Sequence, residues 1–215
     1  MKPFIYLPLK PATIIQGFGA NPAYYARFLD DFGNPQKGHM GLDLQAIHGQ
    51  PVYATHDGTA RTVGPDDHGG QGVYILTNQM DDNLDYHTTI YWHLIGTTDS
   101  KFPQPFQGAK TVKKGDLIGY ANNTGAPFES SGTHLHFGHA ISYANGTFKN
   151  RANGFNGCSD PQPYFDGTYA TDTVINPPPP AINIAVMASQ KAQEGNLSLA
   201  NMLYAIVGVI RAWWK

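Results

Sequence analysis

Short apolar stretches separated by glycine-containing turns run through most of the chain and limit what it can fold into. They fall at residues 13–16, 51–54, 59–63, 72–78, 88–94, 117–120 and 133–137. Each has the length of a strand and is too short for a typical helix, and the spacing between them is fairly even. The strand–helix alternation of a parallel sheet is missing. The pattern therefore predicts an all-β fold, an antiparallel β-sandwich or barrel-like domain.

The composition agrees with a turn-rich β domain. Of the 215 residues, 24 are Gly, 16 Pro, 12 Tyr and 11 Phe, whereas only 14% are charged. The formal net charge is -2 and there is no run of basic residues, which argues against nucleic acid as the main partner. Cys158 is the single cysteine, so no intrachain disulfide can form, and we expect it to be a small buried or loop residue.

Two histidines separated by one apolar residue, His134 and His136, lie in the stretch at 133–137. Successive side chains of a strand point to opposite faces, so both imidazoles share one face while Leu135 and Phe137 point to the other. Such a pair presents nitrogen ligands to a metal ion, or one ligand and one proton carrier. On its own, the same pattern also fits a solvated face of a sheet.

His39 and Asp43 are the obvious partners for this pair. In a straight strand their Cα atoms would lie about 13 Å apart, too far for one ion. A helix would bring them together, but Gly41 and its apolar neighbours make a helix unfavourable. We expect Gly41 to bend the segment so that His39, from a loop, and Asp43, from a strand, converge.

His93 is a further candidate, in the stretch at 88–94. Strand alternation places it on one face with Tyr91 and Thr89, opposite Trp92 and Leu94. It is then either a solvent-facing histidine or, beside a metal ion, a proton carrier or hydrogen-bond donor to the transition state.

These motifs, taken in order, resemble the M23 (LytM/lysostaphin-type) zinc metallopeptidases. The resemblance extends from about Phe18 to Tyr164 and rests on His39-x3-Asp43, Tyr91-x-His93-Leu94 and His134-x-His136-Phe137, with the intervening glycine turns. It implies that one zinc ion is held by His39, Asp43 and His136, and that His93 and His134 are the catalytic histidines.

Some positions depart from the family pattern. Gly138-His139 stands where an acidic residue is common, and Ala20-Asn21 stands where a basic residue is frequent. The segments 21–37 and 99–110 are particular to this chain, and we expect them to wall the substrate groove. The remaining histidines match no motif position and are predicted to be surface or loop residues: His48, His56, His68, His87 and His139.

The function implied by the resemblance is zinc-dependent hydrolysis of peptide bonds in bacterial peptidoglycan, in stem peptides or cross-bridges. The alternative from another class is a non-catalytic M23-like module that binds the cell wall or serves a structural role. Such modules typically lack one or more metal ligands, whereas all of them are present here.

The organisation changes after about residue 168. We expect a peptidase domain at 1–168, a Pro-rich linker at 169–180 and a helical tail at 181–215. Residues 197–214 are largely apolar, so the tail is predicted to contact a protein partner, to associate with a membrane, or to pack back on the domain. No signal peptide is recognisable. These features predict action at the cell wall by a protein carried on a phage virion or released at lysis, with membrane association through the tail as a further route.

Overall fold

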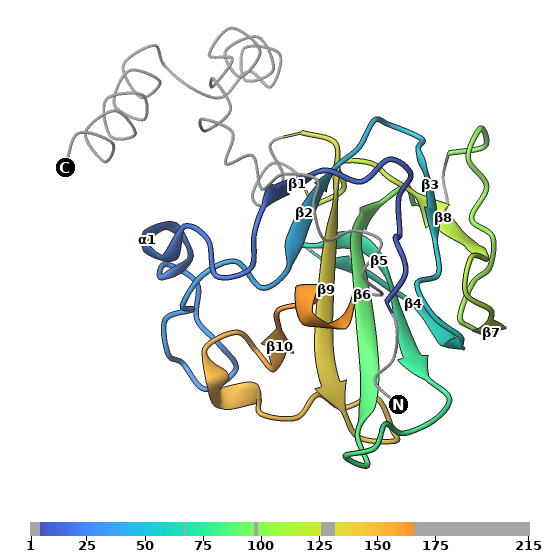
Figure 1. The fold of residues 1–215 in the computed structure, drawn as a ribbon. Coiled ribbons are helices and arrows are strands. Elements are labelled where there is room, and N and C mark those ends of the chain that lie inside the picture. Colours follow the sequence, from blue (N-terminus) through green and yellow to red (C-terminus); the bar gives the residue numbers. More distant parts are fainter. Residues whose placement is uncertain (1–4, 67, 97–98, 126–131, 166–215) are drawn as a thin grey trace, which may run out of the picture. The chain divides into compact units, whose positions relative to one another are not determined.

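The computed structural model describes residues 5–66, 68–96, 99–125 and 132–165 (Figure 1). An 8-stranded antiparallel sheet dominates this part of the chain. Its strands follow the order β1 (Ile14–Gln16), β2 (Leu42–Gln45), β9 (His134–Ser142), β6 (Tyr86–Leu94), β5 (Gly70–Thr77), β4 (Gly58–Asp66) and β7 (Ala109–Val112), and β10 (Cys158–Ser159) pairs with β9. A second, antiparallel sheet joins β3 (Pro51–Tyr53) to β8 (Leu117–Tyr120).

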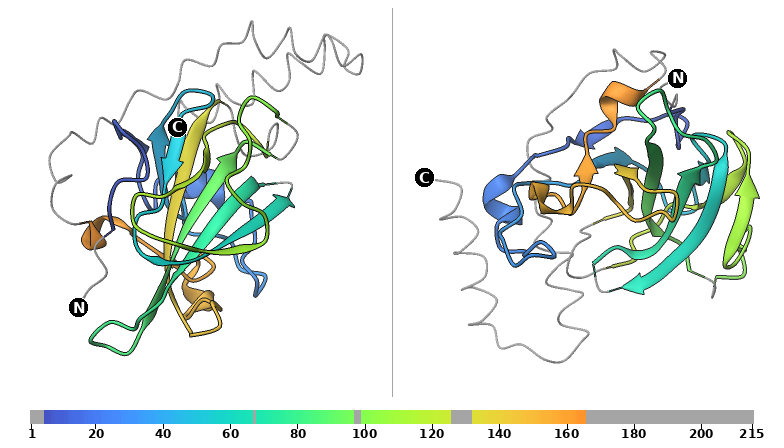
Figure 2. Two further views of the ribbon diagram at one scale, coloured as in Figure 1. Left: turned by 90° about the vertical axis from the view of Figure 1, so that its right-hand side faces the viewer. Right: turned by 90° about the horizontal axis from the view of Figure 1, so that it is seen from below.

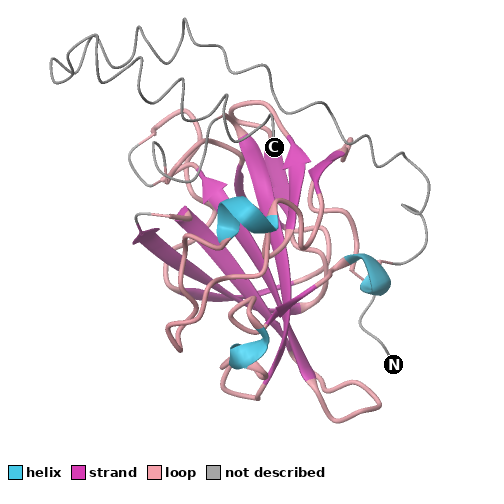
Figure 3. Cartoon of the chain, turned by 90° about the vertical axis from the view of Figure 1, so that its left-hand side faces the viewer, coloured by secondary structure: helices cyan, strands magenta, loops and turns pink. Residues whose placement is uncertain are grey.

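The predicted antiparallel all-β class is confirmed. The large sheet is strongly twisted, and its longest strands, β4, β5, β6 and β9, lie side by side (Figure 2). The described helices are short and lie outside the sheet (Figure 3): α1 (Pro22–Tyr25) and the 3-10 turns η1 (Arg151–Asn153) and η2 (Gln162–Tyr164). The small sheet contributes Val52 and Ile118 to the same hydrophobic core as the large one, which gives the domain its sandwich character.

Strand alternation places the core on one face of β2, β9 and β6. Leu42, Phe137 and Tyr91 pair across these three strands, and all are fully buried. The next positions along, Asp43, His136 and Trp92, pair in the same way and therefore share the opposite face. The register that buries the apolar residues thus also aligns a carboxylate with an imidazole.

The expected face of His93 is wrong. Its backbone φ is 64°, in the left-handed region, and the β5–β6 register shifts between Gln71 and Val73. This bulge interrupts the alternation, so the imidazole does not follow Tyr91 into the core. It packs instead beside His134, with ring centroids 4.5 Å apart, on the face that carries His136. A histidine held in this conformation is uncommon, and such backbone strain concentrates at functional sites.

Cys158 is buried, as predicted, and its burial raises the pKa of the thiol to about 12. The predicted linker and helical tail, 169–180 and 181–215, lie outside the described residues. Among the described residues, we find no helix with the length and apolar character needed to span a membrane.

Candidate metal and catalytic site

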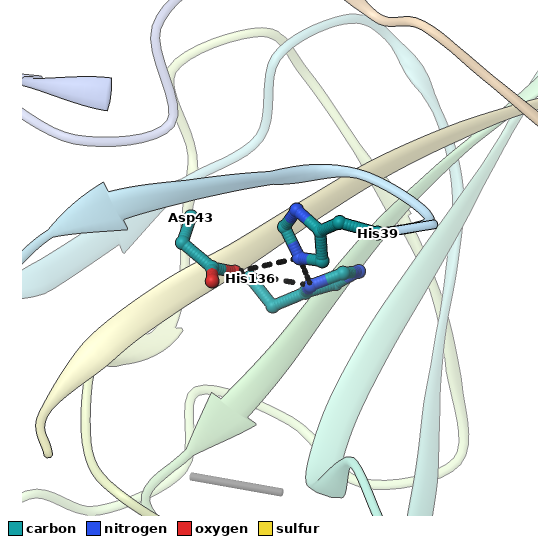
Figure 4. A group of neighbouring side chains, drawn as sticks. All are labelled: His39, Asp43 and His136. Carbon is teal, nitrogen blue, oxygen red and sulfur yellow. Dashed lines mark hydrogen bonds and ion pairs between the residues drawn. The ribbon is translucent and has the colours of Figure 1, made fainter. Parts of the chain in front are cut away.

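His39, Asp43 and His136 converge at one point on the sheet (Figure 4). His39 Nε2 lies 2.9 Å from His136 Nδ1 and 3.0 Å from Asp43 Oδ1, and His136 Nδ1 lies 3.2 Å from the same carboxylate oxygen. Their side chains are 3%, 14% and 15% exposed. Three donor atoms therefore face one another in a nearly closed space, as the sequence motifs predicted.

The loop before β2 delivers His39 to this point. Its backbone is held by two hydrogen bonds, from Gly19 N to His39 O (2.8 Å) and from His39 N to Ala20 O (3.0 Å). Gly41 permits the close approach of the loop to β9. A Cβ at this position would lie 2.6 Å from Phe137 O and 2.8 Å from His136 Nε2. The expected convergence of a loop histidine with a strand aspartate is therefore observed, and Gly41 is needed because backbone and imidazole leave no room for a methyl group.

Hydrogen bonds to the backbone fix which nitrogen of His39 faces the site. Its Nδ1 lies 3.1 Å from the Gly17 carbonyl oxygen, which can only accept, so Nδ1 carries the proton and Nε2 presents a lone pair. That lone pair faces an oxygen of Asp43 at 3.0 Å. Two acceptors at this distance repel each other unless a proton or a metal ion lies between them.

The donor set fits a zinc ion. Two imidazoles and one carboxylate are common zinc ligands, and ligand atoms bound at about 2.0–2.2 Å in a tetrahedral site lie about 3.3–3.5 Å apart, close to the spacing observed here. A protein carbonyl that orients a ligating imidazole through its other nitrogen, as Gly17 does for His39, is the usual support of such a site.

Electrostatics favour the protonation states that metal binding requires. Burial acts to raise the pKa of Asp43, but the charge of His39 and hydrogen bonds from His136 and His39 outweigh it and hold this pKa well below its usual value. Burial lowers the pKa of His136 despite the opposing hydrogen bond to Asp43. An ionised carboxylate therefore lies between imidazoles, and a cation bound there would take the place of the protons that His39 and His136 share with it.

His93 and His134 lie beside these three residues. Like His39, each directs its Nδ1 towards a backbone carbonyl. His93 Nδ1 donates to Thr124 O at 2.7 Å, and His134 Nδ1 donates to Gly132 O at 2.8 Å. The Nε2 of His134 lies 3.5 Å from Asp43 Oδ1. Burial, with smaller contributions from His134 and His136, lowers the pKa of His93 to about 3. The structure thus brings together all five residues that the sequence singled out.

Thr124 supports the site in a way that the motifs did not predict. Its carbonyl orients His93, while its hydroxyl donates to Leu94 O (2.8 Å) and accepts from Gln71 N (3.0 Å). The hydroxyl thus bridges the two strands that separate at the bulge. Thr124 lies in the turn Asn123-Thr124-Gly125. Every residue type has a main-chain carbonyl, so its role in orienting His93 could not be predicted from the sequence.

For His87 and His139, the predicted surface or loop location is wrong, because both lie in strands and are buried. His56 lies in the loop between β3 and β4, as predicted, although it is buried too. All three are on the core side of the sheet. His139 Nδ1 bonds Ser159 Oγ at 2.7 Å, its Nε2 bonds His87 Nδ1 at 2.9 Å, and His87 Nε2 lies 3.3 Å from Asp81 Oδ2. His48 and His68 are exposed, as expected. The buried imidazoles are satisfied by one another and by hydroxyls, which is how polar groups are accommodated in a core.

The stability of the protein should fall below pH 6.5 because of this buried cluster. Burial lowers the pKa of His139 to about 3 and that of His56 to about 4, from an ordinary value of 6.5. Between pH 6.5 and these lower pKa values, the two histidines bind protons in the unfolded chain but not in the folded chain. Stability from each group is therefore complete above pH 6.5 and is lost as the pH falls, at up to about 1.4 kcal/mol per pH unit.

Urea unfolding of the wild type and of His139→Gln at pH 7 and pH 5 measures this effect. We expect the wild type to lose about 2 kcal/mol more than the variant between the two pH values. All other histidines are present in both proteins, so the difference isolates His139. Equal losses would show that His139 is protonated in the folded state at pH 5.

A β-sheet gathers two imidazoles and a carboxylate on one face, with two further imidazoles beside them, and this arrangement is typical of metal-dependent hydrolases. Residues 37–149 match the model of Peptidase family M23, and the chain belongs to this family. The resemblance drawn from the motifs is therefore confirmed at the level of the family.

Curated relatives match only part of their own length. An uncharacterized metalloprotease of Haemophilus influenzae is 33% identical over 99 residues, which cover 46% of this chain and 18% of that protein. A protein of Neisseria meningitidis named DD-carboxypeptidase/endopeptidase Mpg is 32% identical over 128 residues, which cover 56% of this chain and 26% of that protein. The chain thus corresponds to about a quarter or less of these relatives.

Solved structures share the fold. The antimicrobial peptidase lysostaphin from Staphylococcus simulans superimposes with a TM-score of 0.54 at 21% identity, covering 84% of this chain and 61% of that one. Its catalytic domain alone gives a TM-score of 0.50 at 23% identity, covering 72% of this chain and 92% of that one.

Proposed function

We propose that this protein is a zinc-dependent endopeptidase that hydrolyses peptide bonds of bacterial peptidoglycan, in stem peptides or cross-bridges. The observation that carries the proposal is the convergence of His39, Asp43 and His136 on one point, with His93 and His134 beside it. The name of the Neisseria relative supports the hydrolysis of peptide bonds, and the resemblance of the motifs to M23 peptidases supports the choice of substrate.

In this proposal His39, Asp43 and His136 hold the metal ion. Zinc bound there would lower the pKa of a bound water towards about 7 and polarise the scissile carbonyl. Solvent has little access to the three donor side chains, because each of them is at least 85% buried. A carboxylate and two neutral imidazoles would leave net positive charge with a divalent ion, which would favour an anionic oxygen nucleophile near the site.

His93 and His134 are proposed as the catalytic histidines. Each donates its Nδ1 proton to a backbone carbonyl, so each keeps Nε2 as the proton acceptor. One ring takes the proton of the attacking water at Nε2, and the other, which must carry a proton on its own Nε2 for this role, donates a hydrogen bond to the developing oxyanion. The ring that gained a proton then supplies it to the leaving amine.

Digestion of purified peptidoglycan from several wall types, followed by mass spectrometry of the muropeptides, tests the proposed function. We expect new amino and carboxyl termini at one type of peptide bond, and their loss in the presence of a chelator. The alternative function, a non-catalytic wall-binding or structural module, predicts sedimentation with the wall but no new termini from zinc-loaded protein. That outcome would reject the endopeptidase.

For the whole polypeptide we propose a two-part organisation: a peptidase domain at 1–168, a linker at 169–180 and a tail at 181–215 that carries the enzyme to a virion component or a membrane. The proposal rests on the polyproline run at 177–180 and the apolar composition of 197–214.

Deletion of residues 181–215 should leave the hydrolysis of soluble wall fragments within about twofold of the full-length rate, because the proposed catalytic and ligand residues all precede the linker. Cosedimentation with phage particles or with lipid vesicles should be lost. A truncated protein that is folded but inactive on soluble fragments would contradict the two-part organisation.

A further inference from the structure

The segment that follows β1 forms an aromatic surface beside the site. Tyr24, Tyr25 and Phe28 pack together, with ring centroids 5.1 Å apart for the two tyrosines and 6.1 Å apart for Tyr25 and Phe28. The fold provides a local start for α1, since Asn21 is in the left-handed conformation and Pro22 occupies the first helical turn. We call Tyr24, Tyr25, Arg27 and Phe28 the aromatic platform.

The aromatic platform touches both halves of the site. Tyr25 lies against His39, with ring centroids 5.5 Å apart, and its hydroxyl accepts a hydrogen bond from Gln16 Nε2 at 2.7 Å. On its other side, Phe28 contacts the ring of His68 at 5.9 Å. His68 precedes Gly69, whose carbonyl accepts the backbone N–H of His93 at 3.0 Å. The platform therefore borders both the metal-ligand side and the catalytic side.

Arg27 is held on this surface by aromatic faces. Its Cζ lies 3.8 Å from the Tyr24 ring centroid and 4.6 Å from that of Phe28, and the residue is exposed. A guanidinium stacked on rings keeps the N–H groups at its edge directed outward, in the fork that matches a carboxylate.

The acidic residues closest in sequence do not neutralise Arg27. Asp30 accepts the backbone N–H groups of Phe32 (2.9 Å) and Asn34 (2.8 Å) and is buried in its own turn. Asp31 is paired with Arg151. Within the described part of the chain, no carboxylate forms an ion pair with Arg27. Among the described residues, the platform thus offers an oriented cation whose forked edge has no carboxylate partner.

We propose that Arg27 determines substrate specificity by binding a carboxylate of the stem peptide, a few residues from the bond that is cut. This inference rests on the proposed function. Three successive contacts connect His39 to Arg27, through Tyr25 and Tyr24, at 5.5, 5.1 and 3.8 Å. An extended peptide advances about 3.3–3.6 Å per residue, so about four residues at most span this path. A peptide substrate carries free carboxyl groups, and a carboxamide of the same shape is the uncharged counterpart of each. A carboxylate would accept both edge N–H groups of Arg27, whereas a carboxamide offers a single uncharged oxygen.

The test uses two synthetic muropeptides that differ only in one carboxylate or carboxamide, with the full-length, zinc-loaded protein. We expect the wild type to cleave the carboxylate substrate with a kcat/KM about tenfold higher, chiefly through KM. Arg27→Gln should remove this preference, chiefly by slowing cleavage of the carboxylate substrate, with the zinc content unchanged. Arg27→Lys should keep part of the preference because a point charge remains.

Arg61→Gln is the matched control, since it removes one exposed arginine from β4 and should retain the preference. Cleavage of both substrates by Arg27→Gln with an unchanged ratio would overturn the role of Arg27 while leaving the proposed function intact. Failure of the wild type to cleave either substrate, or any peptidoglycan in the muropeptide assay, would overturn the proposed function and the inference together.

Discussion

Replacing His136 by alanine should eliminate metal binding and reduce peptide hydrolysis by more than about 100-fold. The imidazole supplies one of three donor atoms, and His39 and Asp43 alone leave two ligands for an ion that needs at least three from the protein. Loss of a residue that only orients a ligand already costs about 10–100-fold. Metal content by inductively coupled plasma mass spectrometry and the release of soluble muropeptides measure the two effects.

His48→Ala is the control for His136→Ala. His48 is exposed, contacts Asn122 through a hydrogen bond of 2.9 Å, and lies outside the group of donors, so its loss should leave zinc content and rate nearly unchanged. Retention of one zinc per chain by a folded His136→Ala protein would contradict the proposed ligand set.

Removal of either neighbouring imidazole should stop the reaction without releasing the metal. We expect His93→Asn and His134→Gln to lower kcat by about 10²–10⁴-fold, the usual contribution of a positioned acid or base. Neither imidazole belongs to the convergent group of donors, so zinc content should stay at one per chain. Asn is chosen at position 93 because it tolerates the φ of 64° better than Ala does, which separates the loss of the imidazole from backbone strain.

The double variant tests whether the two histidines, as base and as hydrogen-bond donor, act in the same step. A base and a hydrogen-bond donor that act in the same step are not additive, so the double variant should be little slower than the slower single variant. Circular dichroism and zinc content confirm that each protein is folded and loaded. Near-wild-type hydrolysis by folded, zinc-loaded His93→Asn and His134→Gln would reject their catalytic role.

The fold class and the convergence of the site were predictable because they depend on local signals. Alternation along β9 places Leu135 and Phe137 in the core, and the same alternation turns His136 towards Asp43 once β2 pairs in register. Gly41 marked the bend that brings His39 back to β2, and its close contact with His136 supplies the physical reason.

Two features depended on information that periodicity does not carry. The alternation rule assigned His93 to the face of Tyr91, because a bulge produced by one residue with positive φ has no reliable signature in residue type. The rule that unmatched histidines lie on the surface failed for His87 and His139. Each buried imidazole is satisfied by a hydrogen bond to the other, which is far away in sequence. Such pairs become visible only when the register of β6 and β9 is known.

One face of β9 carries site residues and the other carries core residues, which limits the substitutions that this strand can accept. Along one strand, His134 and His136 face the site, Leu135 and Phe137 fill the core, His139 enters the buried histidine cluster, and a Cβ on Gly138 would press on Ile90 at 3.2 Å. Almost every position is therefore constrained from one side or the other. Evolution and protein engineering are left with the segments outside the sheet, such as 21–37, as the places where a new target can be acquired while the chemistry is preserved.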